Sequence, residues 1–355
     1  MQENIQIGNR TIGNGHPAYV IAEAGVNHNG SLEMALDLVR AAKQTGADCV
    51  KFQTFKASAV VTTNAPKANY QLKVTAQEES QLEMLKKLEM GKDKYEQIIQ
   101  VCKEEGIQFL STPYNYDDAD FLNDLNVDAF KLASGQLVEH PFLEHVAKFG
   151  KPMIVSTGMA NLSEVFEAIQ VIRAAGNEQI VLLQCTTNYP SLMSDANVKA
   201  MVSMREAMDI LVGYSDHVEE NYACYAAVSL GAVLVEKHFT LDRNLPGPDH
   251  SCSLEPAGFG QMVQGIRHIE AALGSAVKKP TAAEIANTRG MRRSIVALKD
   301  LAAGTVLEAN MLGFKRPADG MPPKMLSEIL GEKLAVDISL DQPLSYDKIA
   351  WKDNQ

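Results

Sequence analysis

The sequence predicts a (β/α)8 barrel of the TIM type, followed by a small separate domain. Eight short apolar or β-branched runs alternate with longer segments of helical periodicity between residues 18 and 239. After about residue 275 the pattern changes to short strand-like pieces and turns. Eight β-α repeats are typical of a parallel barrel surrounded by helices. A doubly wound open sheet is the weaker alternative.

The predicted strands share a length of six to nine residues and a high content of Val, Ile, Leu and Phe. They span residues 18–25, 48–54, 107–112, 128–134, 152–158, 179–186, 209–217 and 232–239. Helices are predicted between them wherever apolar residues recur at intervals of three and four, as in SLEMALDLVRAAKQTG from Ser31, which ends at Gly46.

Three segments depart from this repeat. Residues 55–92 are too long for an ordinary loop after a strand, so we interpret them as an insertion at the active-site end. A final helix is predicted over 256–274, which closes a barrel domain of residues 1–275. The polar residues 276–293 are predicted to be a linker, and 294–355 a small domain. A domain of that size forms only a modest core, so we expect it to dock onto a partner.

Composition excludes several functions. The chain has 355 residues, with 33 Lys and Arg against 44 Asp and Glu, a net charge of −11. This balance disfavours nucleic acid and anionic membranes as partners. The five cysteines are widely spaced without a CxxC pair, so neither a disulfide framework nor a zinc cluster is indicated. The N-terminus lacks a signal-peptide pattern and no run of 18 apolar residues occurs, so a cytoplasmic location is expected.

Polar side chains gather at the C-terminal ends of the predicted strands, where barrels of this class carry their reacting groups. They are Glu23, Lys51, Gln53, Thr112, Lys131, Ser134, Ser215, His217, Glu236 and His238. Strand alternation places Lys51 and Gln53 on one face, and Glu236 and His238 on a face from which Lys237 points away. The set is therefore predicted to converge on one mouth.

Two chemistries follow from these residues. Lys51 and Lys131 would form a cationic pocket for a phosphate and a carboxylate, although strand-end lysines can also simply reach solvent. His217 and His238 would lie on neighbouring strands about 4.8 Å apart and could share an exchangeable Mn²⁺, Mg²⁺ or Co²⁺ ion. The alternative is that both histidines are structural, since no third protein ligand is evident.

Glu23 and Glu236 are candidates for a general base or a ligand of sugar hydroxyls, or they balance the lysines. Asp249, in the PGPDH turn after the eighth strand, could bind polyol hydroxyls. Cys185 is a weak nucleophile candidate, and we interpret it as a packing residue instead, because no neighbouring sequence pattern explains a lowered thiol pKa.

Taken in order, a series of short motifs resembles the sialic acid synthase family over nearly the whole chain. The motifs are IAEAGVNHNG, DCVKFQTF, STP, KLASG, STGM, CTTNYP, GYSDH, VEKHFTLD, GPDHSCSLEP, RRSIVA and FKRP. The resemblance implies a barrel joined to an antifreeze-like (SAF) domain. It also implies condensation of phosphoenolpyruvate with an N-acetylated mannosamine-type sugar, giving a nine-carbon 2-keto-3-deoxy acid and phosphate.

The resemblance implies a role for each matching residue. Lys51, Lys131, Ser134 and Ser215 would hold phosphoenolpyruvate, supported by Gln53 and Thr112. His217 and His238 would bind the metal, with Mn²⁺ first, which polarises the sugar aldehyde. Glu23 would manage protons, with Glu236, Asp249 and Tyr189 near the sugar. Arg316 matches an arginine that reaches the acetamido group in the partner's site, which implies a domain-swapped homodimer.

Two positions depart from the family pattern on the sugar side. Gln136 stands where N-acetylneuraminate-forming members have Glu, and Thr187 stands at an Asn position. An amide in place of a carboxylate changes which sugar is accepted. N-acetylmannosamine, the precursor of N-acetylneuraminate, is ranked first, with 2,4-diacetamido-6-deoxy sugars, the precursors of legionaminic or pseudaminic acid, as the alternative.

Two rival hypotheses belong to other classes. A Schiff-base aldolase would use Lys51 or Lys131 to form an imine with pyruvate. Alternatively, the C-terminal domain is a carbohydrate-binding or assembly module attached to an inactive barrel, which the presence of both lysines and both histidines disfavours.

Overall fold

A computed structural model describes residues 3–68, 71–75 and 78–351. The chain divides into two compact units, Met1–Gly274 and Ser275–Gln355. Each unit has its own buried core, so each is described by itself.

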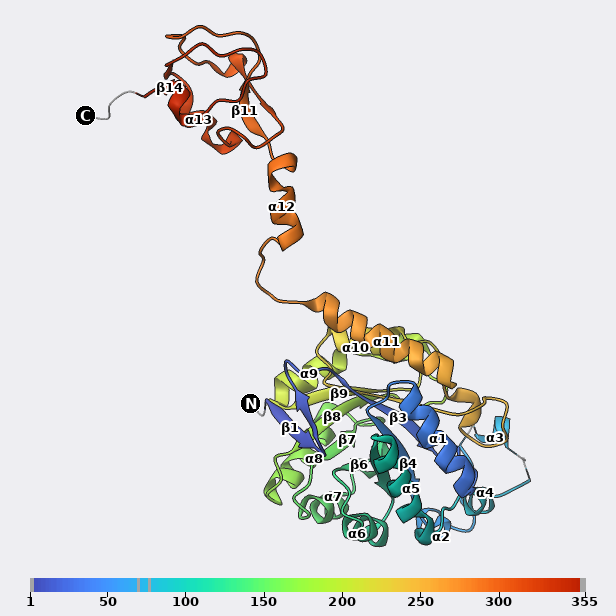
Figure 1. Ribbon diagram of the computed structural model, residues 1–355. Helices are drawn as coiled ribbons and strands as arrows, with labels where there is room; N and C mark the ends of the chain where they lie inside the picture. The colour runs from blue at the N-terminus through green and yellow to red at the C-terminus, as the bar shows by residue number, and fades with distance from the viewer. Residues whose placement is uncertain (1–2, 69–70, 76–77, 352–355) are drawn as a thin grey trace. The chain divides into compact units, whose positions relative to one another are not determined.

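The first unit is a barrel built around parallel strands that helices surround (Figure 1). Its described strands are β3 (Tyr19–Gly25), β4 (Cys49–Thr54), β5 (Gln108–Pro113), β6 (Phe130–Leu132), β7 (Met153–Ser156), β8 (Ile180–Cys185), β9 (Leu211–Asp216) and β10 (Leu234–His238). They pair in the order β5-β4-β3-β10-β9-β8-β7-β6, and the two end strands lie side by side. Each strand falls within or next to its predicted range. The predicted barrel is therefore confirmed, and the open sheet is wrong.

The strands are buried on both faces, as parallel strands between a barrel interior and a helical layer must be. Inside the barrel, an apolar group that includes Tyr19, Ile21 and Leu110 fills the end where the strands begin. An N-terminal hairpin of β1 (Asn4–Ile7) and β2 (Arg10–Gly13), which the periodicity did not predict, adds apolar side chains to this group. The interior is thus closed by packing at one end, which leaves polar chemistry to the other.

The first unit has eleven described α-helices, several of which start with a side-chain cap. They are α1 (Leu32–Gln44), α2 (Ala57–Val60), α3 (Gln71–Val74), α4 (Gln81–Lys87), α5 (Lys92–Glu105), α6 (Tyr116–Asp124), α7 (His140–Ala147), α8 (Leu162–Ala174), α9 (Lys199–Met208), α10 (Tyr222–Ser229) and α11 (Pro256–Leu273). The side chains of Ser31 and Asn161 accept backbone N–H groups at the starts of α1 and α8. Gly106 ends α5 with a positive φ of 65°. None of the described helices is long and apolar enough to span a membrane.

The predicted insertion at 55–92 is folded into the three short helices α2, α3 and α4, which lead into α5. Ser80 and Glu83 form a reciprocal capping box that starts α4. Residues 69–70 and 76–77 of the insertion lie outside the described part of the chain.

The second unit is a small fold with its own apolar core, which includes Ile295, Ile329 and Leu344. It contains α12 (Ala282–Met291), the antiparallel pair β11 (Ser294–Ala297) and β12 (Leu312–Lys315), α13 (Leu326–Ile329), and the pair β13 (Lys333–Leu334) and β14 (Ile349–Ala350). The predicted linker at 276–293 therefore contains a helix. Its start was readable from Thr281 and Glu284, which form a capping box. Residues 352–355 of the predicted domain lie outside the described residues.

Candidate active site

A cavity of about 670 Å³ opens at the C-terminal ends of the barrel strands, and every barrel strand contributes to its lining. This volume is typical of a small-molecule site. The predicted site residues that line it are Glu23, Lys51, Gln53, Thr112, Lys131, Ser134, Gln136, Thr187, Tyr189, Ser215, His217, Glu236, His238 and Asp249. Arg316 belongs to the second unit, where it is exposed and its Nε donates to the Met291 carbonyl.

Four charged side chains form a cluster at the base of the cavity, which we call the inner cluster: Glu23, Lys51, Lys131 and Glu236. Lys51 Nζ lies 2.6 Å from Glu23 Oε2 and 3.8 Å from Glu236 Oε2. Lys131 Nζ lies 3.4 Å from Glu236 Oε1. Two carboxylates therefore balance the two lysines, which is the alternative that the sequence left open, and binding of a phosphate and a carboxylate by these lysines stays a prediction.

The two carboxylates of this cluster have opposite pKa shifts. Burial raises the pKa of Glu23 above its ordinary value, and the Lys51 charge only partly offsets this. Burial also acts on Glu236, but Lys131 and Lys51 together lower its pKa to about 2. Neighbouring carboxyl groups with separated pKa values are a common basis for acid and base roles. Glu23 is therefore the one suited to exchanging a proton, while Glu236 holds a fixed charge.

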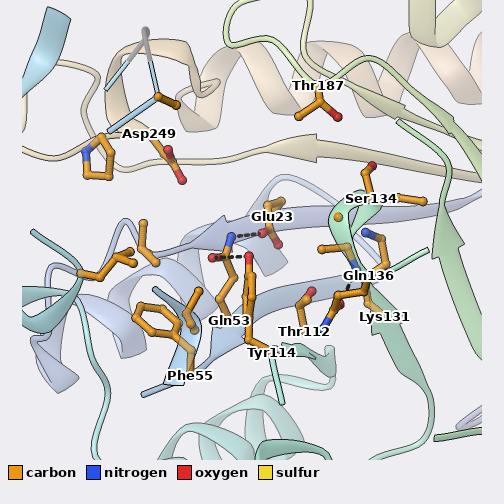
Figure 2. A pocket seen from close by; sticks show the side chains of 18 of the residues that line it. Glu23, Gln53, Phe55, Thr112, Tyr114, Lys131, Ser134, Gln136, Thr187 and Asp249 are labelled. Atoms are coloured by element: carbon orange, nitrogen blue, oxygen red, sulfur yellow. Dashed lines mark hydrogen bonds between the residues drawn. The ribbon is translucent and has the colours of Figure 1, made fainter. Parts of the chain in front are cut away.

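Neutral side chains extend the inner cluster along the cavity. Gln53 Nε2 donates to Glu23 Oε1 at 3.0 Å, and Tyr114 OH donates to Gln53 Oε1 at 3.1 Å (Figure 2). Lys51 Nζ donates to Thr112 Oγ1 and Ser215 Oγ donates to Glu236 Oε1, both at 3.1 Å. Tyr114, which the strand-end reasoning missed, follows directly after β5. Its hydrogen bond holds the orientation of the Gln53 side chain.

The rings of His217 and His238 lie side by side at the ends of the neighbouring strands β9 and β10, with centroids 5.4 Å apart, and the Tyr189 ring centroid lies 4.1 Å from that of His217. His217 Nδ1 donates to the Thr186 carbonyl at 2.6 Å, which leaves Nε2 as a potential metal ligand. His238 Nδ1 is buried without a hydrogen-bond partner. Burial, His217 and Lys51 lower the pKa of His238 well below its ordinary value, so its imidazole is neutral.

These two imidazoles fit a divalent ion that has open positions for water and substrate. Among the described residues, no group of three or more His, Cys, Asp and Glu side chains is arranged to hold a metal. A metal bound here would therefore have His217 and His238 as protein ligands, and most of its coordination positions would be open to water and substrate.

Cys185 is part of the cavity, contrary to its interpretation as a packing residue. Its Sγ lies 3.8 Å from His217 Nδ1 and 3.6 Å from Ser134 Oγ. Burial raises its pKa, but His217, Ser134 and Lys131 outweigh this and lower it overall. Barrel closure brings these partners together, so no local sequence pattern could have indicated them.

Gln136 lines the cavity, but both polar atoms of its side-chain amide are hydrogen-bonded to backbone groups. Ala133 N–H donates to Gln136 Oε1 at 2.9 Å, and Gln136 Nε2 donates to the Pro113 carbonyl at 2.8 Å. A glutamate could not supply the second bond unless it were protonated. The amide thus ties the end of β5 to the loop after β6. Nearby, a Cβ atom at Gly158 would lie 2.2 Å from Thr187 Oγ1, so the close approach of Thr187 requires glycine there.

Asp249 is held over the cavity by contacts between two loops. Asn29 Nδ2 donates to the Pro246 carbonyl at 2.8 Å and lies 3.2 Å from His250 Nε2. His250 Nδ1 lies 2.6 Å from Thr240 Oγ1. Burial and the Glu23 charge raise the pKa of Asp249 to about 7. Asn29 of the NHNG motif thus positions the Asp249 loop, a role that the sequence did not reveal.

A second charged group lies on the opposite face of β9 and β10, and we call it the outer cluster: Asp216, Lys237, Tyr214 and Cys224. Lys237 Nζ donates to Asp216 Oδ2 and to the carbonyls of Val218 and Glu220. Asp216 also accepts from Tyr214 OH at 3.0 Å and Cys224 Sγ at 3.1 Å. Lys237 points away from the cavity as strand alternation predicts, but its burial against Asp216 was not predicted.

The cavity lining includes an apolar group of side chains, which strand-end reasoning missed entirely. This apolar wall consists of Val26, Phe55, Val60, Leu85, Leu88 and Tyr114, which all line the cavity. Its members come from the segments after β3, β4 and β5 and from helices α2 and α4 of the insertion. A polar-residue search cannot find such a surface, because apolar residues in a loop look like any other packing residues.

Comparison with known proteins gives a consistent result. Residues 38–278 match the NeuB family, and residues 292–350 match the SAF domain. The chain is 45% identical to an N,N'-diacetyllegionaminic acid synthase of Campylobacter jejuni, over 88% of this chain and 94% of that one. It is 41% identical to the synthase of the same name from Legionella pneumophila, over 95% and 96%.

A solved structure shows the same relationship. The crystal structure of N-acetylneuraminic acid synthetase from Leptospira borgpetersenii is similar with a TM-score of 0.73 at 30% identity, covering 80% of this chain and 95% of that one. The agreement spans the barrel and most of the chain's length. The chain therefore belongs to the NeuB family of sialic acid-type synthases and is a carbohydrate-biosynthetic enzyme with a (β/α)8 barrel and a SAF domain.

Proposed function

We propose that this chain condenses phosphoenolpyruvate with an N-acetylated mannosamine-type sugar and water, and releases a nine-carbon 2-keto-3-deoxy acid and phosphate. The observation that carries this proposal is the inner cluster beside two imidazoles. Buried ionic groups line the cavity there, yet Glu236 Oε2 and His238 Nδ1 lack hydrogen-bond partners. Unsatisfied buried groups of this kind are costly unless a polar ligand completes them.

The phosphoenolpyruvate would bind through Lys51, Lys131, Ser134 and Ser215, with Gln53 and Thr112 in support. Lys131 is the lysine more easily redirected, because its closest carboxylate contact is 3.4 Å whereas that of Lys51 is 2.6 Å. The phosphoenolpyruvate trianion would replace a carboxylate as the ionic partner of one or both lysines. The net charge of −11 is thus compatible with an anionic substrate, since the positive groups are confined to the cavity.

The bond changes balance without an added oxidant or reductant. Carbon C3 of phosphoenolpyruvate attacks the sugar aldehyde, which forms a C–C bond and leaves an oxocarbenium at C2. Water adds at C2 and loses a proton, and phosphate departs with C–O cleavage. Glu23, whose pKa is raised, would exchange the proton with the aldehyde oxygen. His217 and His238 would hold Mn²⁺, with Mg²⁺ or Co²⁺ as alternatives, and a divalent ion there supplies Lewis-acid polarisation of the aldehyde.

The acceptor that we favour is a 2,4-diacetamido-6-deoxy sugar, the precursor of a legionaminic-type acid. The sequence places N-acetylmannosamine first only because of the general resemblance to the family. Two relatives named legionaminic acid synthases are 45% and 41% identical to this chain, whereas the structurally similar N-acetylneuraminic acid synthetase is 30% identical. N-acetylmannosamine stays as the second candidate because the fold similarity to that synthetase covers most of the chain.

We also propose a domain-swapped homodimer in the cytoplasm, in which Arg316 of one chain reaches the acetamido group in the other chain's cavity. The exposed position of Arg316 in a unit with its own core supports this role. An Arg316→Ala variant should raise the KM for the sugar far more than it weakens dimerisation. A dimer that dissociates while sugar binding stays unchanged would support an assembly module instead.

The decisive experiment is a phosphate-release assay with phosphoenolpyruvate, Mn²⁺ and each candidate sugar. We expect release with at least one sugar, loss of release with EDTA, and recovery when Mn²⁺ is added back. Borohydride with pyruvate should not inactivate the enzyme, because no imine forms at Lys51 or Lys131. Absence of release with every sugar would refute the proposed function, and trapped lysine adducts with EDTA resistance would support the aldolase.

A further inference from the structure

The apolar wall has the properties of a ligand subsite. Val26, Phe55 and Leu88 are 4%, 9% and 5% exposed, and Val60 and Leu85 are half-buried beside them. All line the same cavity as the inner cluster. An ionic base and an apolar side in one cavity are suited to a substrate that is charged or polar at one end and carries methyl groups at the other.

The position of the wall relative to the reacting groups follows from a chain of contacts. Glu23 accepts from Gln53, and Gln53 accepts from Tyr114 (Figure 2). The Tyr114 ring then meets the Phe55 ring edge-on, with centroids 5.8 Å apart. Gln53 and Tyr114 thus connect Glu23 to Phe55 and the rest of the apolar wall. A sugar whose aldehyde is at the inner cluster and histidines would direct its opposite end toward this wall.

The few hydrogen-bonding atoms of the apolar wall indicate which sugar substituent it can accommodate. The side chains of Val26, Phe55, Val60, Leu85 and Leu88 carry no hydrogen-bonding atom. The remaining member, Tyr114, donates its hydroxyl hydrogen to Gln53, so it offers a ligand only an acceptor oxygen. A hydroxyl group on the sugar that left water for this surface would lose hydrogen bonds, whereas a methyl group would gain apolar contact.

We propose that the apolar wall is the subsite for the methyl-bearing end of the acceptor, and that it selects a 6-deoxy sugar over its 6-hydroxy counterpart. This inference rests on the proposed function, because it takes the aldehyde end to react at the inner cluster. It assigns to the insertion, through Val60 of α2 and Leu85 of α4, a specificity-determining role.

The test compares two ligands that differ in one oxygen atom. N-acetylmannosamine and its 6-deoxy analogue, 2-acetamido-2,6-dideoxymannose, are reduced to their alditols, which cannot react. Their binding to the full chain with Mn²⁺ and phosphoenolpyruvate is measured by calorimetry. We expect the 6-deoxy alditol to bind about 10- to 100-fold more tightly, the range for one hydroxyl facing an apolar pocket.

Variants of the wall then locate the effect. A Val60→Thr, Leu85→Asn double variant adds polar atoms at half-buried positions, where the risk of unfolding is small. It should lower the binding ratio about 10-fold while leaving the affinity for phosphoenolpyruvate unchanged. The matched control is Leu82→Asn on the same helix, which is not among the described residues that line the cavity. This control should keep the wild-type ratio.

The outcomes separate the subsite from the proposed function. Equal binding of the two alditols, binding of neither, or the same ratio in wild type and double variant would each overturn the subsite. A changed ratio in the Leu82→Asn control would do so as well. Tight, selective alditol binding without phosphate release from any sugar would instead refute the proposed reaction and leave the subsite standing.

Discussion

The inner and outer clusters contain the same types of charged side chain, but they differ in how completely these side chains are hydrogen-bonded. The inner cluster has two buried lysines and two buried carboxylates, the outer cluster has one of each, and the two clusters lie on opposite faces of β10. In the outer cluster Lys237 has three acceptors, and both carboxylate oxygens of Asp216 are bonded. In the inner cluster Glu236 Oε2 has no hydrogen bond and lies 3.8 Å from Lys51 Nζ, while Glu236 Oε1 lies 3.4 Å from Lys131 Nζ.

The difference shows how a fold separates structural charge from functional charge. A buried ion pair is tolerated when hydrogen bonds satisfy every partner, and it then fixes the local geometry. The outer cluster meets this condition and ties the loop after β9 to β10, next to His217 and His238. The inner cluster is left incomplete, so a ligand can complete it.

The largest effect is expected on stability, from Lys237→Met. The substitution leaves the Asp216 carboxylate buried without its counter-charge and leaves the carbonyls of Val218 and Glu220 without a donor. We expect the free energy of unfolding to fall by about 3–5 kcal/mol, measured by urea denaturation.

A double variant tests the cause. Asp216→Asn combined with Lys237→Met removes both charges, so it should recover part of the lost stability. If the double variant were as unstable as Lys237→Met, ion pairing would not be the source of the effect.

A smaller effect, on catalysis, is expected from Lys131→Met. The variant removes a charge that we place on the anionic substrate, so kcat/KM in the phosphate-release assay should fall about 10²- to 10³-fold. Stability should fall less than in Lys237→Met, because Glu236 keeps Ser215 and Lys51. The control Lys148→Met, at an exposed lysine paired with Glu144, should leave kcat/KM unchanged. Equal destabilisation by Lys131→Met and Lys237→Met would erase the distinction between the clusters.

The smallest effect, when taken per pH unit, is the change in stability that we expect from Asp249. The pKa of this carboxyl is raised from 3.8 to about 7 in the folded chain. Between these values the folded chain binds more protons than the unfolded chain, so the free energy of unfolding falls as pH rises from about 4 to 7. Asp249→Asn should remove a slope of at most about 1.4 kcal/mol per pH unit, seen as a difference between the two proteins' pH profiles. Parallel profiles would show that Asp249 does not take up this proton.

The fold was readable from the sequence because its signals are local. Strand length, helical periodicity and caps such as Ser31 and Asn161 depend on neighbouring residues, so the eight barrel strands were found without tertiary information. The hairpin β1–β2 was missed because its four-residue strands are too short for a clear alternation. Helix α12 was missed because a polar composition outweighed its capping box.

Part of the candidate site could also be predicted from local sequence signals. Side chains at strand ends must converge in a barrel, so Lys51, Lys131, His217 and His238 could be placed at one mouth. Their partners could not be assigned. Lys51 on β4 contacts Glu23 on β3 and also Glu236 on β10, and β10 lies beside β3 only because the barrel closes.

The sequence by itself determined the barrel, the polar strand ends and the family, because periodicity and motif order are properties of the chain. The tertiary structure decided how the charges are distributed. It balanced Lys51 and Lys131 with carboxylates, used both ends of the Gln136 amide on the backbone, and brought the apolar wall beside the inner cluster. The physical reason is that charge pairing, pKa and hydrogen-bond satisfaction depend on groups far apart in sequence, whose distances are set only when the barrel closes.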